Sequence, residues 1–123
     1  MDGKNRTVIH DTDLERPNGL TLEYTQQTLY WIDTNQNRIE SSTVDGSNRR
    51  LISSDRTGSP FGITLYRDIL YFTEREEVKT VPSSGGIVKI IIDNFCAKAF
   101  GIVVVSAERQ PAGTCIQWRV CII

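Results

Sequence analysis

The chain has 123 residues, 39% of them hydrophobic, which is enough for one globular domain with a core. Its net charge of −1 argues against a nucleic-acid binder, because such a protein would carry a clustered basic excess. No apolar run approaches the roughly 18–20 residues that cross a bilayer, so we expect no direct membrane insertion from this segment. Residues 1–5 lack an apolar secretory core, which indicates either a cytosolic chain or a piece whose signal lies elsewhere.

The first residues read as the end of a structural unit whose beginning is missing. Arg6–Ile9 matches the later stretch Arg49–Ile52, so we expect a last strand there. Asn5 opens an Asn-Arg-Thr glycosylation sequon, which is relevant only if the chain is secreted.

Metal-binding patterns are weak in this sequence. Asp11-x-Asp13-x-Glu15 has the spacing of the start of a calcium loop, but Arg16 and Leu22 stand where that loop requires Gly and Glu. The chain has three cysteines, Cys96, Cys115 and Cys121. They form no CxxC pair and the only histidine, His10, is distant, so we expect no zinc site, and no metal or cofactor. Because three is odd, at least one cysteine is free or pairs outside the chain.

The first complete unit is predicted to contain four strands. These are Leu20–Tyr24, Leu29–Asp33, Arg38–Val44 and Arg49–Ser53. In the first of them Leu20, Leu22 and Tyr24 alternate with polar residues, which is typical of a half-buried strand. The second is apolar on both sides, as expected of an inner strand that neighbouring sheets cover on both faces.

The same pattern then returns further along the chain. Its strands are Gly62–Tyr66, Ile69–Glu74, Val78–Val81 and Ile87–Ile92, and a third copy opens at Phe100–Val105. Pro17 and Pro60 are 43 residues apart, and Tyr30 and Tyr71 are 41 apart. A repeat of about 40–45 residues made of short strands is typical of propeller blades. The repeated structural positions are Gly19, Tyr30, Trp31, Asp33, Gly62, Tyr71, Phe72, Glu74 and Gly101.

These residues support a family resemblance. Leu29-Tyr30-Trp31-Ile32-Asp33, with its flanking Pro-x-Gly-Leu and Asp-Gly pieces, resembles the YWTD repeat, or low-density lipoprotein receptor class B repeat. The resemblance implies an all-β fold: a partial YWTD β-propeller over residues 1–111, with two complete four-stranded antiparallel blades and partial flanking blades. Residues 112–123 are expected to be a linker or tail, and Cys115 resembles the first cysteine of an epidermal-growth-factor-like module.

The connections of a four-stranded meander alternate between the two ends of the sheet. We call the end with the strand 2–3 and blade-to-blade connections the loop face, and the opposite end the turn face. The loop face is the candidate protein-binding surface. Its residues are Asp11, Asp13, Glu15, Arg16, Asn35, Asn37, Asp55, Arg56, Arg75, Glu76 and Glu77. Its acidic bias favours basic protein ligands, although an ordinary solvated loop surface would look similar.

Asp33 and Glu74, at the ends of the repeated strands, are interpreted as structural. A carboxylate there can accept backbone N–H bonds from a neighbouring turn. His10 is expected to be exposed at the loop-face end, next to Asp11.

The resemblance implies a non-enzymatic extracellular module that binds or releases ligands in a lipoprotein-receptor-related endocytic or signalling receptor. The family propeller has six blades, so the remaining blades of a parent receptor are implied partners. The alternatives are a basement-membrane scaffold of nidogen type, or a truncated fragment without function. No nucleophile, base and phosphate-loop constellation supports an enzyme, and a propeller hydrolase needs carboxylates from several blades around its axis.

Overall fold

The computed structural model describes residues 6–54, 58–93, 100–105 and 119–122, the last of these and Val104–Val105 by their backbone. Ten strands are present in these residues. They are β1 (Pro17–Glu23), β2 (Thr28–Asp33), β3 (Arg38–Thr43), β4 (Arg50–Ser54), β5 (Pro60–Tyr66), β6 (Ile69–Glu74), β7 (Glu77–Pro82), β8 (Lys89–Ile92), β9 (Ile102–Val105) and β10 (Arg119–Ile122).

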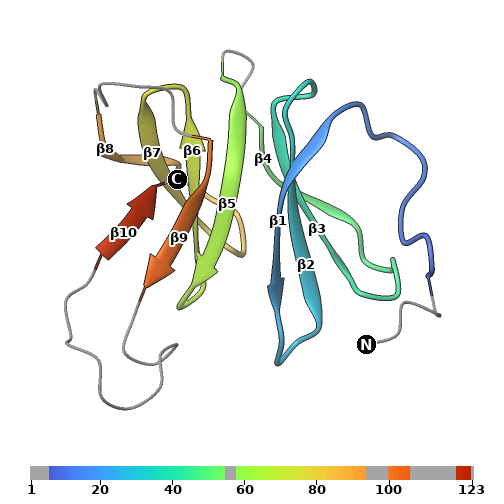
Figure 1. Cartoon of the computed structure of the whole chain (residues 1–123). Coiled ribbons are helices and arrows are strands. Elements are labelled where there is room, and N and C mark those ends of the chain that lie inside the picture. The colour runs from blue at the N-terminus through green and yellow to red at the C-terminus, as the bar shows by residue number, and fades with distance from the viewer. Residues whose placement is uncertain (1–5, 55–57, 94–99, 106–118, 123) are drawn as a thin grey trace.

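Two four-stranded antiparallel sheets stand side by side (Figure 1). Their strand orders are β1-β2-β3-β4 and β5-β6-β7-β8, so each is a simple meander, and β9 pairs with β10 in a third, two-stranded sheet. The predicted pair of blades and the all-β class are confirmed. No described residue lies in a helix, so none of the described segments could cross a membrane as a helix.

Two differences from the predictions lie at the ends of the chain. Arg6–Ile9 is not a strand, and that prediction is wrong. An outer strand forms by pairing with the strand inside it, and no described strand lies beside these residues. The other difference is β10, which pairs with β9 from Arg119 opposite Val105 to Ile122 opposite Ile102, where the sequence predicted only a tail.

The registers define two faces on the first sheet. Leu20 is opposite Trp31 and Leu22 is opposite Leu29, so these residues share the Trp31 face. Because side chains alternate, Tyr30 and Ile32 lie on the other, or Tyr30, face. In the second sheet Ile63 is opposite Phe72 and Leu65 is opposite Leu70, so the Phe72 face repeats the Trp31 face.

The core forms where the Tyr30 face of the first sheet packs against the Phe72 face of the second. Its buried members are Tyr30, Ile32, Ile39, Ile52, Ile63, Leu65, Leu70, Phe72 and Val81. Ile32, Leu70 and Val81 have no exposed surface. This packing explains why the repeated strand is apolar on both sides, since each sheet has a face for each neighbour.

Glycines allow the inner strands to approach closely. A Cβ on Gly19 would lie 2.5 Å from the carbonyl oxygen of Phe61, and a Cβ on Gly62 would lie 2.9 Å from the Cα of Gly101. The inner strands β1, β5 and β9 therefore stand in a row, in which β5 packs on β1 and β9 packs on β5. The glycine of the repeated Pro-x-Gly motif has this steric cause, because no larger residue fits at the contact.

Both outer strands carry a bulge at the same point. Ser53 and Leu51 lie opposite the consecutive residues Ile39 and Glu40, so Ile52 is the extra residue of β4. In the second sheet Ile92 and Ile90 lie opposite Val78 and Lys79, which makes Ile91 the extra residue of β8. The repeat thus extends to local irregularities and not only to strand positions.

Candidate functional site

The loop face forms at one end of the two sheets. In Figure 1 the β2–β3 and β6–β7 turns lie at the same end as the last residue of β4, the first residue of β5 and the segment that enters β1. The Thr34 N–H donates to the carbonyl of Arg16 at 3.0 Å, and the Asn18 amide donates to the Thr34 hydroxyl at 2.7 Å. Segments far apart in the sequence are therefore joined at this end.

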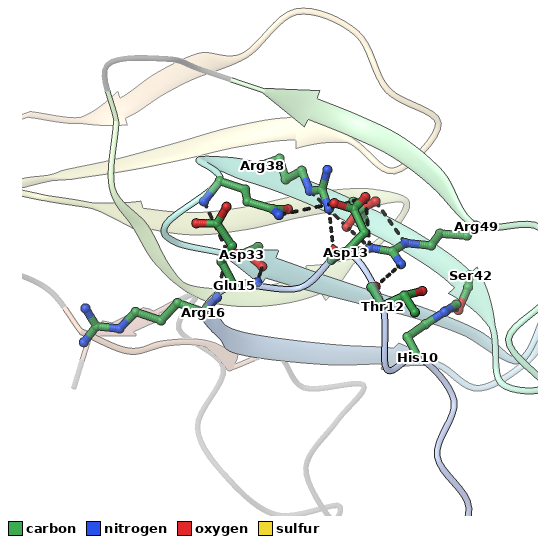
Figure 2. A network of polar contacts seen from close by, with 11 residues as sticks. His10, Thr12, Asp13, Glu15, Arg16, Asp33, Arg38, Ser42 and Arg49 are labelled. Carbon is green, nitrogen blue, oxygen red and sulfur yellow. Dashed lines mark hydrogen bonds and ion pairs between the residues drawn. The ribbon is translucent and has the colours of Figure 1, made fainter.

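Asp33 holds the segment that enters β1. Its carboxylate accepts the backbone N–H of Glu15 at 2.7 Å, that of Arg16 at 3.0 Å and that of Gln36 at 3.2 Å (Figure 2). Asp33 has no exposed surface. Burial alone would raise the pKa of Asp33, but these three N–H bonds outweigh it and lower the pKa below 3.8. Asp33 thus has the structural role that the sequence predicted.

Two arginines fix the same segment further upstream. Arg38 donates to the carbonyl of Asp13 at 2.6 Å and pairs with its carboxylate at 2.9 Å. Arg49 donates to the carbonyls of Thr12 and Asp13 at 2.9 and 2.8 Å. The hydrogen bond from Arg38 lowers the pKa of Asp13 below its usual value. Figure 2 shows both guanidinium groups converging on Asp13, so this loop-face carboxylate is already occupied.

Beneath these contacts lies a buried carboxylate. Glu40 is 5% exposed. Arg49 donates two hydrogen bonds to its carboxylate, from Nε to Oε1 at 3.1 Å and from Nη2 to Oε2 at 2.9 Å. Arg38 Nε lies 3.2 Å from Oε2, close enough for an ion pair. The pKa of Arg49 is raised, first by its hydrogen bond to Glu40 and against the opposing effect of burial. The paired geometry offsets much of the desolvation that a buried charge would otherwise suffer.

His10 covers the ring of Trp31. The two ring centroids are 5.1 Å apart, and His10 Nε2 lies 2.9 Å from the Ser42 hydroxyl. The Arg49 guanidinium also lies over Trp31, 5.4 Å from the ring centroid. His10 is half-buried, so its predicted exposure at the loop-face end is wrong. The polar segment 10–16 therefore takes the place of a neighbouring sheet over Trp31.

The second sheet also has a buried carboxylate that is paired with a cation. Glu74 is 3% exposed and pairs with Lys79, which also lies 3.0 Å from Glu77. Burial would lower the pKa of Lys79, but the hydrogen bonds to Glu74 and Glu77 raise it. Glu74 Oε1 occupies the space where a Cβ on Gly58 would stand, only 1.4 Å away. Glu77, like Asp13, is thus an acid with a cationic partner.

The structure brings part of the predicted binding face together. Asp13, Glu15, Arg16 and Asn37 surround the entry to β1, with Asn35 exposed beside them, whereas Asp11 lies further back on the segment across Trp31. Arg75 and Glu76 are exposed at the turn of the second sheet, and Glu77 begins β7. Asp55, Arg56 and the sequon residue Asn5 lie outside the described residues.

The sequence did not reveal the charged residues under the loop face. Arg38, Glu40 and Arg49 were assigned only to strands, although residues 38 and 40 share a face and Glu40 pairs with Leu51 across the sheet. That cross-strand geometry is the signal that could have found them. In the part of the chain that the structure describes, no three His, Cys, Asp or Glu side chains gather as metal ligands would.

Comparison with known proteins gives the repeat a family. Residues 27–67, which run from the end of the β1–β2 turn to the β5–β6 turn, match the family described as low-density lipoprotein receptor repeat class B. Human low-density lipoprotein receptor-related protein 5 is 37% identical over 112 residues, which is 89% of this chain and 7% of that protein. This chain belongs to the YWTD, or low-density lipoprotein receptor class B, repeat family.

Solved structures share the propeller arrangement. The nidogen–laminin complex contains a chain of TM-score 0.73 and 29% identity, and the match covers 82% of this chain and 40% of that one. A gluconolactonase from Xanthomonas campestris has TM-score 0.58 and 27% identity, over 74% of this chain and 32% of the other. The YWTD chain spans between 4% and 12% of the length of the first curated relatives it matches.

Proposed function

We propose that this chain is a non-enzymatic, extracellular protein-binding module that contacts its ligand through the loop face. The observation that carries the proposal is the fixed entry segment: Asp33, Arg38 and Arg49 hold residues 12–16 by main-chain bonds. A binding surface that is already ordered loses less conformational entropy when a ligand docks. The family and the receptor-related relative support a place in a lipoprotein-receptor-related ectodomain at the cell surface, with an endocytic or signalling role.

The charge expected of the ligand follows from the charged side chains that are exposed on the loop face. Asp13 and Glu77 each have a cationic partner, and the exposed acids Asp11, Glu15 and Glu76 add further negative charge to the described loop face. A basic protein ligand remains the proposed partner, with charge acting mainly on the rate of association.

A scaffold role of nidogen type is the second candidate, and the TM-score of 0.73 to a chain of the nidogen–laminin complex favours it. Immobilised laminin provides the direct test. Binding of this chain to laminin that survives removal of the loop-face charges would support the scaffold reading over the receptor reading.

The main test screens the chain, made multivalent, against purified extracellular proteins on an array. The loop-face variant combines Asp11→Ser, Glu15→Ser and Glu76→Ser, none of whose side chains holds the segment. The matched control combines Gln26→Ser and Asp68→Asn on the turn face. We expect the first variant to lose a hit that the control retains. Loss in the control alone, or no binding to any protein, would contradict the proposal.

A further inference from the structure

Asn18 and Gly19 form an Asn-Gly pair at an irregular point of β1. The register of β1 with β2 shifts between Pro17 and Leu20, so that Asn18 and Gly19 both lie opposite Ile32. No other asparagine in the sequence is followed by glycine. Because glycine has no Cβ, its main-chain nitrogen is open to approach by the side chain that precedes it.

Both members of the pair have a structural use. A Cβ on Gly19 would lie 2.5 Å from the carbonyl oxygen of Phe61, so packing requires glycine there. The Asn18 side-chain amide donates to the Thr34 hydroxyl at 2.7 Å, and that hydroxyl donates to the carbonyl of Pro60 at 2.6 Å. Asn18 is therefore joined through Thr34 to the first residue of β5.

The second sheet holds its equivalent glycine in a different way. Gly62 is the counterpart of Gly19, and Thr73 is the counterpart of Ile32. The Gly62 N–H donates to the Thr73 hydroxyl at 3.0 Å in a buried contact. Ile32 has no hydroxyl, so its side chain cannot restrain the Gly19 N–H in this way. The nitrogen that follows Asn18 thus lacks a restraint that the repeat provides in the second sheet.

We propose that Asn18 is a site of spontaneous deamidation, in which the Gly19 nitrogen is the nucleophile because it lacks the restraint found at Gly62. This nitrogen forms a bond to Cγ of Asn18 and gives up its proton, and the side-chain nitrogen leaves as ammonia. The product is a five-membered succinimide. Asn18 is exposed, so water can then break one of the two carbonyl C–N bonds of the ring, which leaves aspartate or isoaspartate at this position.

Deamidation removes the contact between position 18 and Thr34. The hydroxyl proton of Thr34 is donated to the Pro60 carbonyl, so the new carboxylate and the Thr34 oxygen would face each other as two acceptors. Isoaspartate also lengthens the main chain of β1 at its bulge. Both products add a negative charge at the loop face, whichever ligand that surface binds.

Incubation of the full chain in mildly alkaline buffer, followed by peptide mapping with mass spectrometry, tests the site. We expect aspartate and isoaspartate to accumulate at position 18 several times faster than at Asn48, which is also exposed but precedes Arg49. The control Asn18→Gln retains an amide but cannot close a five-membered ring, so it should show no conversion at this position. No product at position 18 of the folded chain, while the urea-unfolded chain is converted there, would overturn the proposal.

A second Asn-Gly pair tests the role of the glycine N–H. Phe61→Asn introduces this pair in the second sheet, where the Thr73 hydroxyl holds the Gly62 N–H. In the folded chain we expect position 61 to deamidate several times more slowly than position 18, and Thr73→Val to remove most of that difference. In urea the two positions should react at similar rates, because neither N–H is restrained there.

Far-ultraviolet circular dichroism checks that each variant keeps its strands, and Thr73→Ala replaces a Thr73→Val chain that does not. Equal rates at the two positions of the folded Phe61→Asn chain would overturn the proposal. So would a rate at position 61 that does not change when the Thr73 hydroxyl is removed.

Discussion

The two sheets share one register but differ in what stands beside them. Phe72 in the second sheet is 4% exposed because the first sheet packs against it, whereas Trp31 at the same position is 6% exposed because His10 and Arg49 cover it. Similar burial is thus reached by apolar packing in one sheet and by a polar segment with ion pairs in the other. The repeat determines the strands, and the neighbour determines the chemistry of the covering layer.

The largest expected effect comes from truncating these two aromatics. Phe72→Ala should cost about 3–5 kcal/mol, because it leaves a cavity between two packed sheets. Trp31→Ala should fall at the lower end of that range, since segment 10–16 can settle onto a smaller side chain. Urea unfolding of both variants measures the difference. A greater loss for Trp31→Ala would mean that the polar segment packs as firmly as a sheet.

Asp33→Asn should cost about 1.5–3 kcal/mol at neutral pH, since charged hydrogen bonds to three N–H groups are weakened. The pKa of Asp33 is lowered in the folded state, so its contribution is complete above the ordinary value of 3.8 and is lost as the pH falls below it. We expect the difference between wild type and variant to be constant from pH 8 to 5 and to shrink below pH 4. Unfolding curves across that range would contradict this if the difference closed near pH 6.

Gly58 in the second sheet corresponds to Glu15 in the first, and Glu74 corresponds to Asp33. Gly58→Ala therefore tests the contact between Gly58 and Glu74. The new methyl group would stand where the Glu74 carboxylate lies, at a cost of about 1–3 kcal/mol. Asp33, the counterpart of Glu74, is one methylene shorter, and the counterpart of Gly58 is Glu15, which carries a side chain. Glu74→Asp should therefore restore part of the stability that Gly58→Ala removes, as measured in a double-mutant cycle. Strictly additive losses would show that the two residues are independent.

The smallest effect is expected at the β5–β6 turn, which has two residues where the β1–β2 turn has four. Arg67 and Asp68 both have left-handed backbones, with φ of 46° and 60°. Asp68→Gly should stabilise the chain by about 0.5 kcal/mol, because glycine adopts this conformation without a side-chain clash. Asp68→Ala should destabilise it by a similar amount. Unfolding temperatures that shift in opposite directions for the two variants would confirm the turn type.

Much of the fold was predictable because the same motif recurs in the sequence. The repeated aromatic motif located Leu29–Asp33 and Ile69–Glu74 within a residue of β2 and β6, and the copied glycines indicated the number of blades. Arg6–Ile9 was wrong because a strand also needs a partner, which the local pattern does not encode. The prediction that Leu20–Tyr24 is half-buried was wrong at its ends, where Leu20 lacks a neighbour and Tyr24 follows the last residue of β1.

The candidate site was less predictable than the fold. The role of Asp33 followed from its place at a strand end beside a turn. The Glu40–Arg49 pair depends on register across β3 and β4, and the contact of His10 with Trp31 depends on the path of an irregular segment. Neither kind of information is carried by residue types along a single strand.

The bulges at Ile52 and Ile91 have a consequence for the rim of the molecule. An outer strand offers unpaired N–H and C=O groups, and a regular edge of this kind recruits further strands into fibrils. In β4 and β8 the extra residue interrupts that regular series at its middle. The outer strand β8, which contains three consecutive isoleucines, is thereby a poorer template for the addition of another strand.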